Sequence, residues 1–147
     1  MYKHIVIATD GSELAGKGLE QGLELAAAVG AQVTIVTASE RWTPADAGVV
    51  WGGSASMLEE YRTHVTDQAN EVLAAAGARA DQLGVRHESV YVAERYPADA
   101  ILETAAGRGA DLIVMASHGR RGLNRLLIGS QTNAVIAHST IPVLVVR

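Results

Sequence analysis

Glycines and arginines gather in the stretch Met115–Thr132 with a spacing that suits phosphate chemistry. The stretch reads MASHGRRGLNRLLIGSQT and follows the apolar run Asp111–Met115 (DLIVM). This order predicts a strand, a glycine-containing loop and the start of a helix. Such a loop offers backbone N–H groups and the positive end of a helix dipole to an anion. Arg120, Arg121 and Arg125 add positive charge with no acid between them, so we expect the loop to hold the phosphates of a nucleotide.

Three residues of this stretch have separate tasks in that hypothesis. Gly119 has no Cβ, so its backbone can approach a phosphate closely. The N–H groups of Gly129 and Ser130, with the Ser130 hydroxyl, can donate to phosphate oxygens at a helix N-terminus. The arginines can pair with phosphate in a forked geometry. Alternatively, they are solvated or pair with acids of a partner subunit.

Three residues at the ends of predicted strands complete the candidate site. Asp10 can accept hydrogen bonds from ribose hydroxyls or hold a magnesium-bound water, although it could instead cap the helix that follows it. Met115 and Ala38 would give apolar contact to a base. The resulting pocket would thus take its residues from three separate segments of the chain.

The sequence offers no catalytic or metal-binding constellation. His118 lies beside Gly119, but no carboxylate or nucleophile is spaced with it, which favours a solvated loop histidine. Ser12 and Ser117 lack a nucleophile-elbow context. There is no G-x-x-x-x-G-K-[ST] and no G-x-G-x-x-G after the first strand, which argues against a P-loop NTPase and a dinucleotide dehydrogenase. The other histidines show no metal-ligand spacing; they are His4, His64, His87 and His138.

Composition bounds the class of protein. The 147 residues, 48% of them hydrophobic and none of them cysteine, predict one globular domain over residues 1–147 without disulfides. No apolar run is long enough for a transmembrane helix, and we expect a cytoplasmic protein. The net charge of −4 argues against nucleic-acid binding. Residues 1–111 carry 8 basic and 16 acidic side chains, and the remainder carries only basic ones, which suits a small anionic ligand or an interface between chains.

Apolar runs and helical periodicities alternate along the chain. Lys3–Ala8 and Gln32–Thr37 are predicted strands that flank a helix over Glu13–Val29, which Ser12 would cap. The later segments continue this alternation: helix Ala55–Leu83, strand Val85–Val92, helix Ala98–Gly107, strand Asp111–Met115, helix Ser130–His138 and strand Ile141–Val146. The order predicts an α/β, three-layer Rossmann-like fold, with a five-stranded parallel sheet and helices on both faces. Val85–Val92 and the last strand are expected near the edges.

In such a sheet a ligand binds beyond the carboxyl ends of the strands, where the strand order reverses. The loops after the first and fourth strands should meet there, with the end of the second strand alongside. The irregular segment 38–54, which holds Trp42 and Trp51, is either a functional lid or a surface excursion whose tryptophans cover the core or a partner chain.

The chain resembles the single-domain universal stress proteins over its whole length. The resemblance is clearest in three blocks of sequence: KHIVIATDGSE, ADLIVMASHGRRGLNRLLIGS and VIAHSTIPVLVVR. The nucleotide-binding branch of that family carries Gly-x2-Gly-x9-Gly-Ser/Thr. Here Gly119 is the second glycine, nine residues follow, and Gly129 and Ser130 complete the motif. Ala116 stands in place of the first glycine, and we expect its methyl group to weaken nucleotide binding without abolishing it.

The resemblance implies a homodimer, formed through the last strand, that binds ATP or a related adenine nucleotide (AMP or ADP), with or without Mg²⁺. The family's binding residues, carried over by position, are Ala8, Thr9, Asp10, Ala38, Met115, Ala116, Gly119, Gly129, Ser130 and Gln131. Members of the family act in stress tolerance, usually as nucleotide-responsive binding proteins.

Three functions follow from these observations. The first is a binding module whose nucleotide occupancy tunes its interaction with an unknown protein partner. The second is a slow ATPase, which the lack of an evident general base after Asp111 disfavours. The third is a structural dimer without nucleotide, against which the retained Gly119, Gly129 and Ser130 speak.

Overall fold

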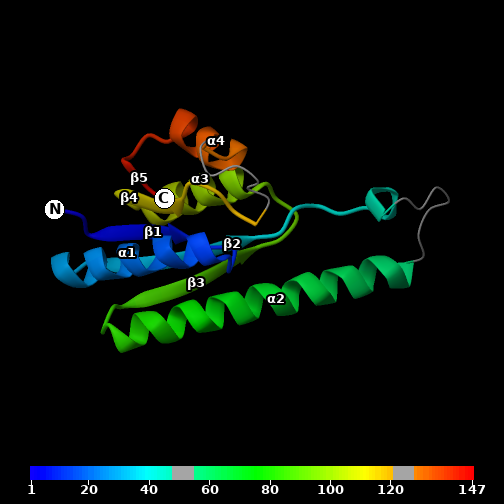
Figure 1. Ribbon diagram of the computed structural model, residues 1–147, viewed down its shortest axis with the longest axis horizontal. Helices are drawn as coiled ribbons and strands as arrows, with labels where there is room; N and C mark the ends of the chain where they lie inside the picture. The colour runs from blue at the N-terminus through cyan, green and yellow to red at the C-terminus, as the bar shows by residue number, and fades with distance from the viewer. Residues whose placement is uncertain (48–54, 121–127) are drawn as a thin grey trace.

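The computed structural model describes residues 1–47, 55–120 and 128–147. Helices and strands alternate in the expected order (Figure 1). The elements are β1 His4–Ala8, α1 Glu13–Val29, β2 Gln32–Ala38, the 3-10 helix η1 Pro44–Ala47, α2 Ala55–Gln82, β3 His87–Val92, α3 Pro97–Arg108, β4 Leu112–Ala116, α4 Ser130–His138 and β5 Val143–Val146. The predicted strands over 85–92 and 141–146 began two residues too early. Apolar residues just before a strand can be buried in the core without pairing with a neighbouring strand, and the sequence does not distinguish the two cases.

The sheet is parallel throughout, with strand order β3-β2-β1-β4-β5. The predicted edge positions of the third and fifth strands are therefore confirmed. β1 is hydrogen-bonded to β2 on one side and to β4 on the other. The strand order thus reverses at β1, and the loops that follow β1 and β4 leave the sheet side by side.

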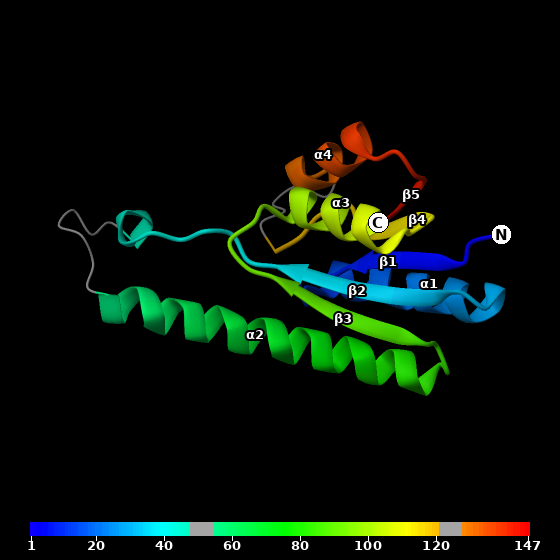
Figure 2. The same ribbon diagram turned by 180° about the vertical axis from the view of Figure 1, so that it is seen from behind.

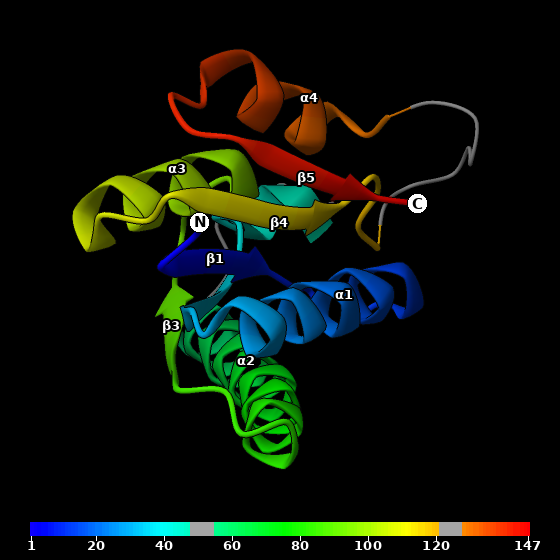
Figure 3. The ribbon, with the colours of Figure 1, turned by 90° about the vertical axis from the view of Figure 1, so that its left-hand side faces the viewer.

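Helices cover both faces of the sheet, as Figure 3 shows from the end of the molecule. α1 and α2 pack on the face that carries Ile5 and Ile7, whereas α3 and α4 pack on the face that carries Val6. All three side chains are fully buried. A strand that is buried on both faces is apolar at consecutive positions, which is why β1 and β4 were recognisable as continuous apolar runs.

Small residues set the distance between α1 and the sheet. A Cβ built on Gly22 would lie 2.6 Å from the Ile7 Cδ1 atom, so any larger residue there would force the buried Ile7 side chain to shift. Ser12 caps the helix as predicted, because its Oγ accepts a hydrogen bond from the Ala15 N–H at 3.3 Å. Gly30 ends the helix with a φ of 72°, in the left-handed region that glycine adopts readily.

The N-terminal half of α2 projects beyond the carboxyl ends of the strands, next to the segment that leaves β2 (Figures 1 and 2). Trp42 of that segment stacks on Tyr61 of α2, with ring centroids 4.6 Å apart. Among the described residues no helix is both long and apolar enough to cross a membrane.

Candidate functional site

The carboxyl ends of β1 and β4 bring together two loops that are far apart in sequence. Asp10 connects them, because each of its carboxylate oxygens accepts one backbone hydrogen bond. Oδ1 accepts from the Ser12 N–H at 2.9 Å, within its own loop. Oδ2 accepts from the Arg120 N–H at 2.7 Å, in the loop after β4. Since Ser12 caps α1, the alternative that Asp10 caps this helix is wrong.

Two glycines allow the loops to approach each other. A Cβ on Gly119 would lie 2.6 Å from the Asp10 Oδ2 atom, so a side chain at this position would push the carboxylate away. Gly11 has a φ of 79°, and a Cβ there would lie 2.6 Å from Val72 and 3.1 Å from the Arg120 guanidinium. Arg120 therefore lies across the Gly11 turn. Arg121 and Arg125 lie outside the described residues.

The start of α4 is fixed to the end of β4 by three hydrogen bonds. The Gly129 N–H donates to the Ser117 carbonyl at 2.8 Å. The Thr132 hydroxyl donates to the carbonyl oxygens of Ala116 and Ser117 at 3.0 and 3.2 Å. The Gly129 N–H is therefore already hydrogen-bonded within the protein. Gly129 would contribute to a site through the space that its missing side chain leaves.

Donors nevertheless remain beside the loops that follow β1 and β4. Ser130 is exposed and is the first residue of α4, whose N-cap, Gly129, has no side chain to bind the helix terminus. Neither the Ser130 N–H nor its hydroxyl is hydrogen-bonded to any residue within the described ranges, and the same is true of the Gly119 N–H. An anion that enters between these residues would meet unsatisfied donors at a helix N-terminus.

Several other candidate residues have tasks inside the protein. Thr9 is buried, and its hydroxyl oxygen accepts from the Gly11 N–H at 3.3 Å. Met115 is buried in the core under α3 and α4, so its side chain presents little surface to a base. The Gln131 Oε1 atom accepts from the Ala98 N–H at 3.0 Å and so caps the N-terminus of α3.

The three alanines among the candidates lie at the ends of the strands. Ala8 and Ala38 are half-buried at the ends of the neighbouring strands β1 and β2. Ala116 is buried at the end of β4, and α1 packs on it, because a Cβ on Gly18 would be in ordinary van der Waals contact with the Ala116 nitrogen, at 3.4 Å. The ends of these three strands therefore offer backbone groups and small side chains.

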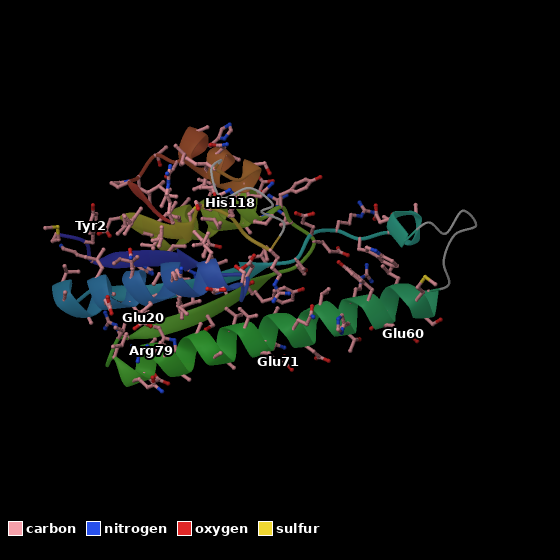
Figure 4. All side chains as sticks on the ribbon, in the orientation of Figure 1. Tyr2, Glu20, Glu60, Glu71, Arg79 and His118 are labelled. Carbon is pink, nitrogen blue, oxygen red and sulfur yellow. The ribbon has the colours of Figure 1, made fainter. Side chains whose placement is uncertain are left out.

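Two supporting residues of the site were not predicted from the sequence. Thr132 and Ser117 are 3% exposed, which is unusual for hydroxyl side chains, and they connect β4 to α4. A threonine three residues after a glycine, on the buried face of a helix, was the available signal. His118, labelled in Figure 4, follows on the same loop, and its Nδ1 lies 3.0 Å from the Ser117 Oγ atom.

The segment after β2 is held in place by contacts with α2 and by hydrogen bonds of its own. Because Trp42 stacks on Tyr61, its ring is held against α2. The Thr43 N–H and hydroxyl both donate to Asp46 and hold the pKa of this carboxyl below its usual value. Trp51 lies outside the described residues.

Comparisons with known proteins show the family of this chain. The profile of the universal stress protein family matches residues 1–147. The universal stress protein YxiE of Bacillus subtilis (strain 168) is 32% identical over 150 residues, which cover 100% of both chains. This chain therefore belongs to the universal stress protein family.

Solved structures extend the similarity to three dimensions. The structure of MJ0577, a universal stress protein of Methanocaldococcus jannaschii, superimposes with a TM-score of 0.83 at 27% identity, covering 99% of this chain and 96% of that one. A universal stress protein solved in complex with cAMP superimposes with a TM-score of 0.71 at 26% identity, covering 99% and 97%. That relative thus binds an adenine nucleotide.

Proposed function

We propose that this protein binds an adenine nucleotide in the crevice between the loops that follow β1 and β4. The carrying observation is the close approach of Asp10 to Gly119 and Arg120, with the exposed N-terminus of α4 beside them. The ligand is ATP or its relatives AMP and ADP, and the cAMP complex of a relative supports this class. The Gly119 and Ser130 N–H groups, with the Ser130 hydroxyl, would hold phosphate.

The residues at the ends of β1 and β2 would hold the nucleoside. Ala8 and Ala38 are half-buried at the ends of neighbouring strands and offer small apolar surfaces and backbone groups to a base. Asp10 is the carboxylate at the centre of the crevice, where it would accept from a ribose hydroxyl or from water bound to Mg²⁺.

Binding of a nucleotide would affect the edge strand of the sheet through one hydrogen bond. The Ser117 N–H donates to the Val146 carbonyl of β5 at 2.8 Å, so the loop that would hold phosphate is joined directly to the edge strand. On β5, Leu144 is 38% exposed, and an apolar edge of this kind requires a partner strand. We infer a homodimer through β5 whose binding of another protein responds to the nucleotide in stress tolerance.

Binding explains the site better than catalysis does. A general base needs a free carboxylate oxygen or imidazole near the attacking water. No acid follows Asp111 in the sequence, so the loop after β4 supplies no carboxylate for this task. Any hydrolysis of ATP is therefore expected to be slow.

The first experiment identifies the ligand. Purified protein is denatured and the supernatant is examined by mass spectrometry for adenine nucleotides. Calorimetric titrations with AMP, ADP, ATP and cAMP follow, with and without Mg²⁺, and sedimentation velocity measures the dimer in each state. An empty supernatant together with no heat of binding at millimolar nucleotide would contradict the proposed nucleotide binding. The chain would then have the fold of the family without this function.

The substitution Gly119→Asp tests the location of the site. A side chain at this position meets the Asp10 carboxylate and adds a second negative charge, so we expect a loss of nucleotide affinity of about 100-fold or more. Gly107→Asp is the matched control, because nothing lies within 4 Å of a Cβ at position 107 in α3. Equal affinities for the two variants would place the nucleotide elsewhere.

A further inference from the structure

The Asp10 carboxylate occupies a position in the crevice that is suited to an anion. Its Oδ2 atom accepts from the Arg120 N–H at 2.7 Å, across 110 residues of sequence. A backbone N–H in a glycine-containing loop at the carboxyl end of a parallel strand is a usual phosphate donor. In this protein a side chain of the chain itself takes that donor.

The carboxylate is held in this position from several sides. The Ser12 N–H binds Oδ1 at 2.9 Å, which restricts rotation of the group. The missing Cβ of Gly119 leaves the space that Oδ2 occupies. The Arg120 side chain lies over Gly11, next to the turn that carries Asp10.

A phosphate oxygen and a carboxylate oxygen cannot both use the Arg120 N–H, and at such separations their negative charges repel strongly. We propose that Asp10 is an internal anion that competes with the ligand for the phosphate position. The two loops are thereby held together without ligand, and an entering phosphate takes over the Arg120 N–H while the carboxylate moves aside. This inference rests on the proposed function for its physiological ligand, but the contact itself concerns any phosphate anion.

The competition sets the anion affinity of the site. A carboxylate that contributed only by binding ribose would leave the Arg120 N–H free for the anion and would oppose the anion only through weaker long-range repulsion. A carboxylate that occupies the phosphate position weakens the binding of every such anion. Pyrophosphate, which has no ribose, therefore separates the two roles of Asp10.

The experiment titrates pyrophosphate into ¹⁵N-labelled protein in metal-free buffer and follows the amide resonances of Gly119 and Arg120. We expect Asp10→Asn, which keeps the size of the side chain and removes its charge, to bind pyrophosphate about tenfold more tightly than the unmodified protein. Glu13→Gln is the matched control, because Glu13 is an exposed acid in the first turn of α1 and is not part of this contact. Its affinity should stay within about twofold of the unmodified protein.

Hydrogen exchange without ligand gives a second readout. The Arg120 amide should exchange at least about tenfold faster in Asp10→Ala than in the unmodified protein, because its acceptor is gone. Unchanged exchange, or pyrophosphate affinity that is equal, lower or undetectable in Asp10→Asn, overturns the inference. If both results are as expected but no adenine nucleotide binds to the unmodified protein, the proposed function fails and the competition by Asp10 stands.

Discussion

At the amino ends of the strands, side chains form a closed network of hydrogen bonds. The Thr34 hydroxyl donates to Glu88 at 2.9 Å and accepts from the Nε2–H of His4 at 2.8 Å. The Nδ1 atom of His4 lies 3.1 Å from the carbonyl oxygen of Arg108, at the end of α3. Arg108 completes the network by donating to both oxygens of Glu88 at 2.6 Å. Thr34, Glu88 and Arg108 thus have side-chain partners within the protein, whereas the buried Nδ1 atom of His87, at the start of β3, has no hydrogen-bond partner among the described residues.

At the carboxyl ends of the strands, backbone groups and small residues form the contacts between the loops. Some hydrogen-bond donors there have no partner among the described residues. Ser130 has neither its N–H nor its hydroxyl bonded within the described ranges, and Asp10 binds an N–H that a ligand could take. Buried polar networks that are fully satisfied stabilise one structure. Donors left unsatisfied at a helix terminus are available for a ligand. The comparison separates an end that supports the fold from an end that we propose for function.

The largest expected effect on stability is at the amino end. His4→Ala removes a side chain of a residue that is 8% exposed, leaves the Thr34 hydroxyl without its Nε2–H donor and opens a cavity, at a cost of about 2–3 kcal/mol in the free energy of unfolding. Urea denaturation measures this cost. Nucleotide affinity of the folded variant should change by less than about twofold, because the crevice is at the other end of β1.

A control clarifies this first prediction. His64 is exposed on α2, and His64→Ala should change the free energy of unfolding by no more than about 0.5 kcal/mol. If His4→Ala instead lowered nucleotide affinity with little loss of stability, the separation between the two ends would be incorrect.

A smaller effect is expected where the crevice itself depends on a buried hydroxyl. Thr132→Val keeps the shape of the side chain and removes the hydrogen bonds to Ala116 and Ser117, at a cost of about 1 kcal/mol. Because these bonds position the start of α4, nucleotide affinity should fall about three- to tenfold in calorimetric titrations. Ser139→Ala, which removes a hydroxyl bonded to the Ile141 carbonyl at the other end of α4, should leave affinity unchanged. Equal affinity losses in both variants would show that the start of α4 has no special role.

The elements of this fold were predictable because their signals are local. The run Asp111–Met115 is apolar at consecutive positions since β4 is buried on both faces. Ser12 and Gly30 mark the two ends of α1 through hydrogen bonding and a left-handed φ that depend only on neighbouring residues. The edge positions of β3 and β5 also followed, because the residues of the predicted strand 85–92 alternate in polarity and Pro142 lies near the start of the last predicted strand.

The connections within the site were not predictable, because they join residues distant in sequence. The Asp10–Arg120 hydrogen bond spans 110 residues, and the Gln131–Ala98 hydrogen bond spans 33. The sequence and its resemblance to the family assigned Asp10 and Gln131 to the site. They could not show which atoms of these two residues form hydrogen bonds within the protein. Met115 likewise matched a family position, whereas its burial depends on the packing of α3 and α4.

The smallest effect is expected away from both ends, where Arg79 of α2 pairs with Glu20 of α1 (Figure 4). The hydrogen bond from Arg79 holds the pKa of Glu20 below its ordinary value of 4.5. A carboxyl whose pKa is lowered by folding stabilises the protein above its unfolded-state pKa, and this contribution disappears as the pH falls through the folded-state pKa.

Glu20→Gln should therefore lower the melting temperature by about 1 °C at pH 7, because the pair is largely exposed and screened by salt. The difference from the unmodified protein should shrink below pH 4.5 and with added salt, which calorimetric scans from pH 7 to pH 3 can follow. Arg79 remains charged throughout this range, since Glu20 raises its pKa further. A melting difference that did not change with pH would mean that Glu20 stabilises the contact between α1 and α2 by packing and not by its charge.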